Sequence, residues 1–422
     1  MFQSALRSIK DDFSRSLFYW LTFVLTSMFM FLFFNLSYSD MIGVTFIHAR
    51  NDMSTFTTVL VIGICMIVIF FANDFYVKKK SKELAVRLVC GGTYFQITQY
   101  LLFQTGVLFI LAIPFGIGLA ILFIPSINYM LMSFLNSSAQ LHIQWNAIVS
   151  TTIIIVFEIF WCTLLNLGYA YRSSIKTLMY DEKTIIHFSI PLPFNISSKI
   201  KKFLSIIMFI GPIVIFYFNG DNPNSMLILS IIGMIGLYCS IDQVVVPFLN
   251  YLTQYKYVSY HKRIVYLGFL RNDILMMKKN IILLIVSSVL LLSILVSCLE
   301  QPMEVMLAMI SFVVINILLA LSVMFKFSTE MLGRQRIFYS LERIGYMKNV
   351  QKDILMKEVW SLYGFIGGIS LFYIVNIFIV LWLYQLLNIY LLIGMCIVFV
   401  VPLILCAIAS QIYYQRLILK ED

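Results

Sequence analysis

The sequence predicts an all-α integral membrane protein, with ten transmembrane helices in two parallel four-helix repeats joined by two linking helices. Three observations predict this class: an apolar composition, ten long apolar stretches, and a basic pattern that recurs in both halves of the chain. Of the 422 residues, 61% are hydrophobic and 12% are charged, against roughly 45–50% and about 25% in soluble domains. A soluble fold has too little interior for this apolar surface, so the surrounding medium is predicted to be lipid.

Ten segments are long and apolar enough to cross a bilayer as helices, which takes about 20 residues each. The first begins near Leu17 with no small-residue cleavage site after it, so we expect a retained helix rather than a signal peptide. The fifth is short and is the weakest candidate. The predicted spans are 17–36, 55–73, 100–123, 147–170, 203–218, 226–249, 281–298, 305–325, 359–384 and 389–413.

The basic residues predict the orientation, because Lys and Arg are retained on the cytoplasmic side of a membrane. With the N-terminus inside, 29 of the 30 Lys and Arg residues fall in inside segments and only Arg50 lies outside. We therefore expect a multi-pass cell-membrane protein with both termini in the cytoplasm. The net charge of +10 then belongs to these loops. No dense basic tract with interleaved aromatic residues is present, so nucleic acid is not expected as a partner.

A basic segment recurs after the second and the eighth predicted spans. Residues 78–92 read KKKSKELAVRLVCGG, and residues 333–345 read GRQRIFYSLERIG. Each is a basic stretch, then an amphipathic segment, then glycine. Aligning Gly91 with Gly345 relates the two segments by an offset of 254 residues.

The segments before the first and the seventh predicted spans also resemble each other. Residues 5–16 and 269–280 mix apolar and charged residues at helical spacing, which is typical of a helix in the membrane interface. Together the two pairs of segments predict a first repeat at 1–170, a linker with spans five and six at 171–262, and a second repeat at 263–422. Both repeats enter from inside and are therefore parallel.

The first basic segment resembles the FtsX-like permease family, the membrane subunits of MacB-type ABC transporters. The family pattern is a basic stretch, Glu, an apolar segment containing Arg, and then Gly; it is present here as Lys82, Glu83, Arg87 and Gly91. The second copy is degenerate, because Ile337 stands where the family has Glu. The ten-span layout is similar to the bacitracin-resistance (BceB-like) permeases of low-GC Gram-positive bacteria, but it lacks their large extracellular domain between spans seven and eight.

The resemblance implies that both segments are coupling helices on which a separate cytoplasmic ABC ATPase docks, with two ATPase copies per permease. ATP and Mg²⁺ would then be bound by the partner, because this chain contains no G-x-x-x-x-G-K-[ST] motif. A simpler alternative is that the lysines at 78–82 only fix the topology and contact anionic lipid. The implied ATPase-coupling residues are Lys82, Glu83, Arg87, Gly91, Arg334, Arg336, Glu342, Arg343 and Gly345.

Two carboxylates lie inside predicted spans, Glu158 near the middle of the fourth and Asp242 in the inner half of the sixth. A charged carboxylate there costs roughly 2.5–3.5 kcal/mol on insertion scales. Glu158 fits equally a site for a cationic substrate or proton and a structural carboxylate bonded to a neighbouring span. Asp242 fits the structural role better, because Gln243 and the inner end of the span are close. No Lys or Arg lies mid-span to pair with either carboxylate.

No catalytic or metal site is predicted. The seven cysteines show no metal-binding spacing and the four histidines are scattered over different loops. The chain also lacks a nucleophile elbow and an HExxH motif. We therefore expect a transport subunit rather than an enzyme.

Three functions remain open. The leading one is an ABC export permease that moves an amphipathic peptide or lipid. By analogy with similar small permeases of low-GC Gram-positive bacteria, this function would be the export of an antimicrobial peptide or immunity to it. An FtsX-type regulatory protein would instead use ATPase-driven motion to activate an outside hydrolase. A secondary transporter would work through Glu158 without an ATPase.

Overall fold

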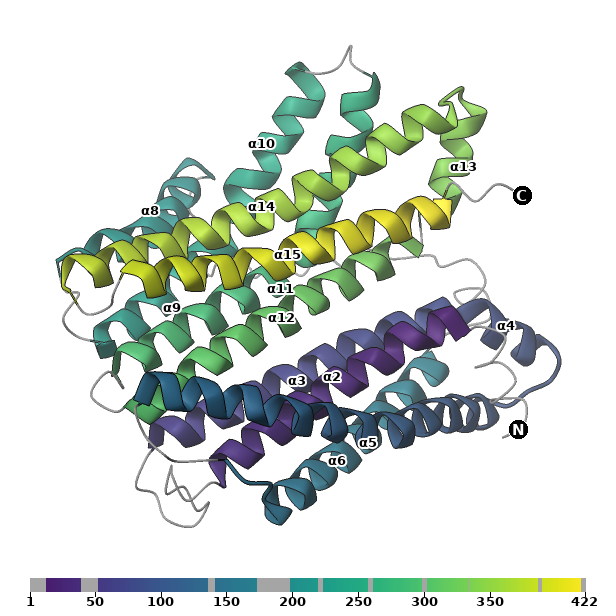
Figure 1. Cartoon of the computed structure of the whole chain (residues 1–422). Coiled ribbons are helices and arrows are strands. Elements are labelled where there is room, and N and C mark those ends of the chain that lie inside the picture. The colour runs from purple at the N-terminus through teal and green to yellow at the C-terminus, as the bar shows by residue number, and fades with distance from the viewer. Residues whose placement is uncertain are drawn as a thin grey trace. The chain divides into compact units, whose positions relative to one another are not determined.

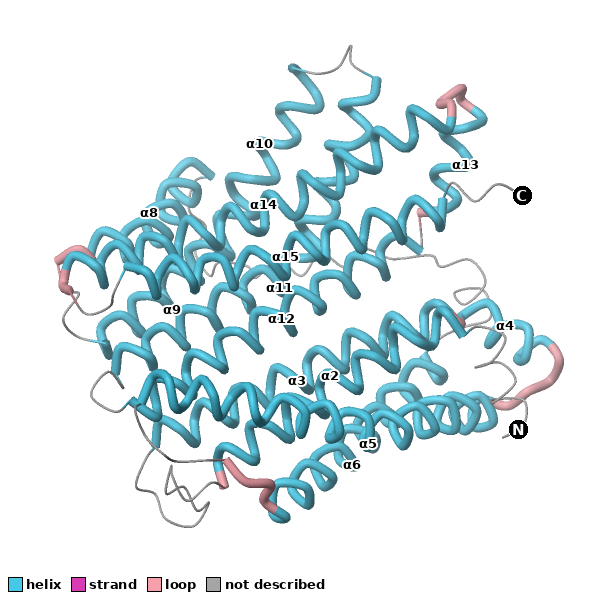
Figure 2. The backbone as a smooth tube through the Cα atoms, viewed as in Figure 1, coloured by secondary structure: helices cyan, strands magenta, loops and turns pink. Residues whose placement is uncertain are grey.

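The computed structural model describes residues 13–38, 52–135, 141–172, 198–218, 223–256, 261–297, 302–332, 334–385 and 389–418. Every regular element in these ranges is helical, and they contain no strand (Figure 2). This agrees with the predicted all-α class. It also satisfies the requirement that backbone groups in lipid form their hydrogen bonds within the segment.

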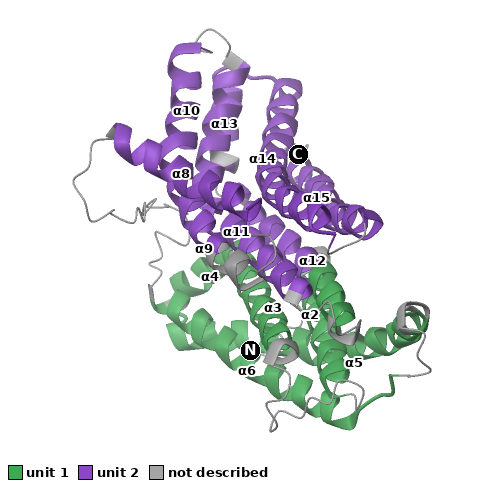
Figure 3. Ribbon diagram, turned by 90° about the vertical axis from the view of Figure 1, so that its left-hand side faces the viewer, with its two compact units in different colours: residues 1–184, 300–314 green, residues 185–299, 315–422 purple. Residues whose placement is uncertain are grey.

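The chain divides into two compact units (Figure 3). The first comprises Met1–Thr184 and Glu300–Val314, and the second comprises Ile185–Leu299 and Ile315–Asp422. The described helices of the predicted linker at 171–262 belong to the second unit. The repeat boundaries at 170 and 262 stay a prediction.

The first unit is built around α2, which packs against α3, α5 and α6 (Figure 1). Polar side chains join these apolar helices: the Tyr19 hydroxyl donates to Asn73 at 2.8 Å, and Asn73 donates to Asn166 at 2.8 Å. In membranes such bonds contribute about 0.6 kcal/mol each and fix the pairing of helices. The helices are α2 (Phe13–Ser37), α3 (Asp52–Lys79), α4 (Ser81–Val89), α5 (Tyr94–Leu135) and α6 (Trp145–Arg172).

The second unit is built around α11, which packs against α9 and α14, while α14 also packs against α8 and α15. The helix pair α8 and α9 crosses closely at Gly236, because a Cβ there would collide with the backbone of Met208 and Phe209. Its elements are α8 (Ser198–Phe216), α9 (Pro223–Ser240), a π-helical turn (Ile241–Val245), α10 (Val246–Tyr251), a second π-helical turn (Leu252–Lys256), α11 (His261–Ser297), part of α12 (Pro302–Leu332), α13 (Gln335–Arg343), α14 (Lys348–Leu383) and α15 (Ile389–Ile418).

Nine helices of the described chain are long and apolar enough to cross a membrane, and they correspond to nine of the ten predicted spans. The missing one is the fifth, in α8. Three lysines lie within its first five residues, which leaves an apolar part at 203–216. That part is about 21 Å long, shorter than the roughly 30 Å hydrocarbon core. The ten-helix layout is therefore not confirmed. Two cytoplasmic termini require α8 to cross, so this orientation stays a prediction.

Two helices extend beyond their predicted bounds. The segment 269–280, expected as an interfacial helix, is part of α11 and continuous with the seventh span. Its Asp273 is fully buried, so it does not lie on a solvent-facing side. The third span was expected to end at 123, but α5 continues to Leu135 through Pro114 and Pro125. The counterpart at 5–16 lies outside the described residues up to residue 12.

Candidate functional site: two short helices and an intramembrane carboxylate

The two predicted coupling segments fold into helices of the same design. Both α4 and α13 are nine residues long, and both their ends differ by the predicted offset of 254 residues. Each follows a long apolar helix at once and precedes another, α5 or α14, whose first residues are separated by the same offset. The segments therefore share their local layout as well as a sequence pattern.

Both short helices end in the same glycine-dependent turn. Gly91 has a φ of 90° and Gly345 a φ of 102°, which side chains other than glycine rarely adopt. After α4, the amide of Gly92 donates to the carbonyl of Arg87 at 2.9 Å. After α13, the amide of Tyr346 donates to the carbonyl of Leu341 at 3.0 Å. These bonds form a Schellman motif that stops each helix and turns the chain into the next span. The two glycines are required by this geometry.

The α4 helix is fixed to its unit by one apolar face. Leu84 is buried in a cluster with Val77 of α3 and with Ile97 and Tyr100 of α5, and Leu88 packs against that cluster. The opposite face is open: Val86, Val89 and Cys90 are exposed. A short helix with one packed face and one free apolar face can contact a partner while staying attached to two spans.

Glu83 is the centre of a polar network at the base of α4. It accepts a hydrogen bond from the Tyr100 hydroxyl at 2.5 Å and from Arg87 at 3.2 Å, and Lys80 lies 3.6 Å away. Arg87 also stacks over the Tyr100 ring at 3.7 Å. Burial acts to raise the pKa of Glu83, but the hydrogen bond from Tyr100 and the charges of Lys80 and Arg87 outweigh it. The pKa of Glu83 is therefore below its ordinary value, and the side chain is an anion at neutral pH.

This network continues from α4 into the helix bundle. The Gln104 amide of α5 donates to the Tyr100 hydroxyl at 2.7 Å and accepts from the Tyr76 hydroxyl of α3 at 3.2 Å. The Tyr76 ring stacks on the Tyr19 ring of α2 at 4.4 Å between centroids. Tyr19 begins the bonds to α3 and α6 described above. A continuous series of buried contacts thus joins α4 to each of the other helices α2, α3, α5 and α6.

A different set of side chains fixes α13. Arg334, which caps its N-terminus, is buried and pairs with Asp273 of α11 and Glu358 of α14. The Arg334 guanidinium also lies over the Phe269 ring, 4.9 Å from its centroid. Burial acts to lower the pKa of Arg334, but the two carboxylates outweigh it and raise the pKa. The guanidinium therefore stays charged and holds α11, α13 and α14 together.

Apolar packing and one amide complete the attachment of α13. Phe338 is buried and contacts the rings of Phe269 on α11 and Tyr414 on α15. Gln351 of α14 donates to the carbonyl of Tyr346 at 3.0 Å. The outer face is again apolar, with Ile337, Tyr339 and Ile344 exposed.

The structure sorts the residues predicted to couple to an ATPase. Glu83 and Arg87 pair with each other, Gly91 and Gly345 terminate the helices, and Glu342 and Arg343 are exposed. Arg334 is not a surface contact as a docking role would suggest, because it is buried among carboxylates. Lys82 and Arg336 lie in the two helices, but their side chains are outside the described part.

Four residues of these networks were not singled out from the sequence: Tyr100, Gln104, Asp273 and Glu358. Each lay at or near the edge of a predicted span, where polar residues are ordinary. The signal that was present is positional, because Gln104 and Glu358 are separated by the same offset of 254 residues.

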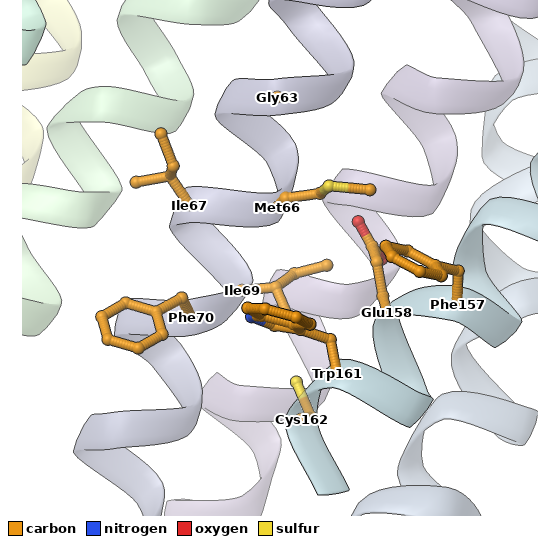
Figure 4. Close-up of a pocket in the computed structure, with 9 residues that line it drawn as sticks. All are labelled: Gly63, Met66, Ile67, Ile69, Phe70, Phe157, Glu158, Trp161 and Cys162. Carbon is orange, nitrogen blue, oxygen red and sulfur yellow. The ribbon is translucent and has the colours of Figure 1, made fainter. Parts of the chain in front are cut away.

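Glu158 lies in a cavity of about 410 Å³ between α3 and α6. The cavity is lined by Gly63, Met66, Ile67, Ile69, Phe70, Phe157, Glu158, Trp161 and Cys162 (Figure 4). Its lining is apolar apart from the carboxylate, and both carboxylate oxygens are buried without a hydrogen-bond partner among the described residues. The neighbouring hydroxyl or amide expected in the structural reading of Glu158 is thus not found within the described chain.

Asp242 has the opposite surroundings. It accepts a hydrogen bond from Lys278 of α11 at 2.5 Å, and the Lys278 ammonium lies 3.2 Å from the centroid of the Tyr238 ring. The expectation that no Lys or Arg would pair with Asp242 is therefore wrong. The reason is that α11 is continuous, which brings Lys278 beside the π-helical turn that carries Asp242. A paired carboxylate that joins α9 to α11 fits the structural role.

One family model matches the chain. The FtsX-like permease C-terminal domain matches residues 55–178, which include α3, α4, α5 and α6. No curated protein matches the sequence.

Proposed function

The match over 55–178 supports the FtsX/MacB-type ABC permease family, and on that premise we propose that this chain is the membrane permease subunit of an ABC exporter. ATP hydrolysis belongs to a separate cytoplasmic ATPase, in two copies, one for α4 and one for α13. The observation that carries the proposal is the shared design of these two helices, each with one face packed on its unit and an exposed apolar face.

The proposed mechanism follows from how these helices are attached. When an ATPase moves α4, the motion reaches α3 and α5 at once through Leu84 and the Glu83–Tyr100 bond. The buried contacts through Gln104, Tyr76 and Tyr19 pass it to the rest of the first unit. In the second unit Arg334 transmits a displacement of α13 to α11 and α14. Close-packed interiors respond to such a push by shifting whole helices rather than by deforming locally.

The proposed substrate is an amphipathic peptide, exported or expelled as an antimicrobial peptide. Two features support this: the helices at the surface are apolar over most of their length, and the cavity at Glu158 combines apolar walls with one acidic group. A substrate that already resides in the membrane reaches such a surface laterally.

The test is purification of the tagged full chain from its native membrane in mild detergent. We expect a Walker-A protein to co-purify and the complex to hydrolyse ATP. Ile344→Asp places a charge on the exposed face of α13 and is expected to weaken the co-purification, because a carboxylate is costly in a buried apolar interface. Tyr390→Asp, at an exposed aromatic residue at the start of α15, is the matched control and is expected to have no effect.

A second candidate, a secondary transporter, is favoured by the unpartnered carboxylate of Glu158. It predicts transport by the purified chain in vesicles without any ATPase, driven by an ion gradient. The exporter proposal predicts no such transport until ATPase and ATP are added.

A further inference from the structure

The cavity at Glu158 has the features of a binding site within one unit. It is formed by α3 and α6 alone, and its volume of about 410 Å³ lies in the range of small-molecule sites. Figure 4 shows the Glu158 carboxyl pointing toward Met66 of α3, with the ring of Phe157 beside it. Phe70, Phe157 and Trp161 are 40%, 52% and 52% exposed, so the cavity opens to the surface of the helix pair.

Glu158 is in an unusual electrostatic position. It is 3% exposed and has no partner for either oxygen among the described residues. The helices that pack in this unit carry no Lys, Arg or His near it: α3 has none before Lys78, α5 has none, and α6 has none before Arg172. Cys65 and Cys162 are the titratable groups closest to it. A cation for this carboxylate therefore has to come from outside the unit's helices.

The depth of Glu158 excludes ordinary phospholipid headgroups. It lies 13 residues after the first residue of α6 and 14 before the last, which is about 20 Å from either end at 1.5 Å per residue. A headgroup stays at the interface, about 15 Å from the bilayer centre. The group that reaches Glu158 must be carried there by an apolar body.

We infer that this cavity binds a primary ammonium group attached to an apolar body. The ammonium hydrogens are donated to the two free oxygens of Glu158, and the faces of Phe157 and Trp161 add cation–π attraction. The apolar body lies along Met66 and Phe70. The lysine or N-terminal amine of an amphipathic peptide has this chemistry. The inference rests on the proposed function only where it identifies the bound cation as the exported cargo.

Gly63 supplies a steric test that leaves the charge in place. A Cβ at Gly63 meets no atom within 4 Å, so a larger side chain enters the cavity instead of distorting the helix. Gly63→Leu is therefore expected to fill the binding space. Gly168→Leu is the matched control: a Cβ at this exposed α6 glycine also meets nothing within 4 Å, and it does not line the cavity.

The experiment measures saturable binding of radiolabelled dodecylamine to the full chain in phosphatidylcholine nanodiscs, after subtraction of binding to empty nanodiscs. We expect one site per chain, weakened at least tenfold by Glu158→Gln and by Gly63→Leu and unchanged by Gly168→Leu. Dodecyltrimethylammonium, with the same charge but no N–H, is expected to bind several-fold more weakly, and dodecanol not to saturate. The melting temperature of Glu158→Gln is expected not to fall, because the variant removes an unpaired buried charge.

Unchanged binding in both Glu158→Gln and Gly63→Leu would overturn the inference, as would equal binding of dodecanol. The result is separate from the fate of the exporter proposal. Saturable amine binding without any effect on the ATPase activity of the complex would keep the site and reject its role as cargo site. ATPase coupling without amine binding would do the reverse.

Discussion

Removing Arg334 is expected to destabilise the second unit far more than removing one of its two carboxylate partners. Arg334 carries one positive charge against the two negative charges of Asp273 and Glu358, all three buried. Arg334→Met leaves two carboxylates in a dry site with no cation. Breaking a buried pair in this way costs about 3–5 kcal/mol, which for a unit of this size lowers the melting temperature by on the order of 10 °C.

The carboxylate variant works in the opposite direction on the charge balance. Glu358→Gln leaves a neutral pair of Arg334 and Asp273, and the Gln oxygen can still accept the hydroxyl of Tyr414, which now lies 3.5 Å from Glu358. We expect a cost of no more than about 1.5 kcal/mol. Arg334→Lys should fall between the two, because an ammonium cannot bridge two carboxylates as a guanidinium fork does.

The assay is thermal melting of the purified full chain in detergent, followed by reactivity of its buried cysteines toward a fluorogenic maleimide. The reasoning predicts the order wild type, Glu358→Gln, Arg334→Lys, Arg334→Met from most to least stable. If Glu358→Gln melts as low as Arg334→Met, charge balance does not govern this site and the reasoning is refuted.

Three further predictions concern the attachment and the ends of the short helices. Tyr100→Phe removes the hydroxyl that joins Glu83 to Gln104; we expect a cost of about 1–3 kcal/mol and weaker stimulation of ATP hydrolysis by substrate, and full stimulation in a stable variant would contradict the role of this contact. Gly345→Ala forces a side chain into a φ of 102° and should cost about 1–3 kcal/mol, with Gly345→Asn less costly because Asn tolerates positive φ better; equal melting temperatures for the three proteins would argue against the turn. Because the pKa of Glu83 is lowered from its ordinary value of 4.5, the stability it contributes is complete above that pH and is lost as the pH falls through the lowered value. Melting profiles of wild type and Glu83→Gln should therefore converge only below about pH 4.5, and convergence near neutrality would show that Glu83 is not held as an anion.

The local structure of the short helices was predictable because glycine and the basic–apolar pattern are local signals. Gly91 and Gly345, placed by alignment of two sequence segments, are the two glycines of the described chain with positive φ. The degeneracy at Ile337 is also structural, since it is related to Glu83 by the same offset and is exposed rather than bonded.

What could not be predicted depends on contacts between distant helices. Asp273 was expected on an interfacial helix, because its surroundings mix charged and apolar residues. Its burial follows from a partner 61 residues away, Arg334, which a single sequence does not indicate. The pairing of Asp242 with Lys278 was missed for the same reason, since the two lie 36 residues apart on different helices. The weak fifth span illustrates another limit, because lysines within a short apolar run leave its depth in the membrane undetermined.

The central claim is that α4 and α13 are the surfaces on which the ATPase acts, and cross-linking from equivalent positions tests it most directly. Cys90 is an exposed native cysteine at the end of α4, and Ile344 is its counterpart at the end of α13, 254 residues later. A photoreactive maleimide attached to Cys90, and separately to Ile344→Cys in a chain whose Cys90 is replaced by serine, is predicted to form an adduct with the ATPase from both positions. Transport that continues while neither position labels the ATPase, or reaction of these cysteines with an impermeant maleimide added outside intact cells, would contradict the account.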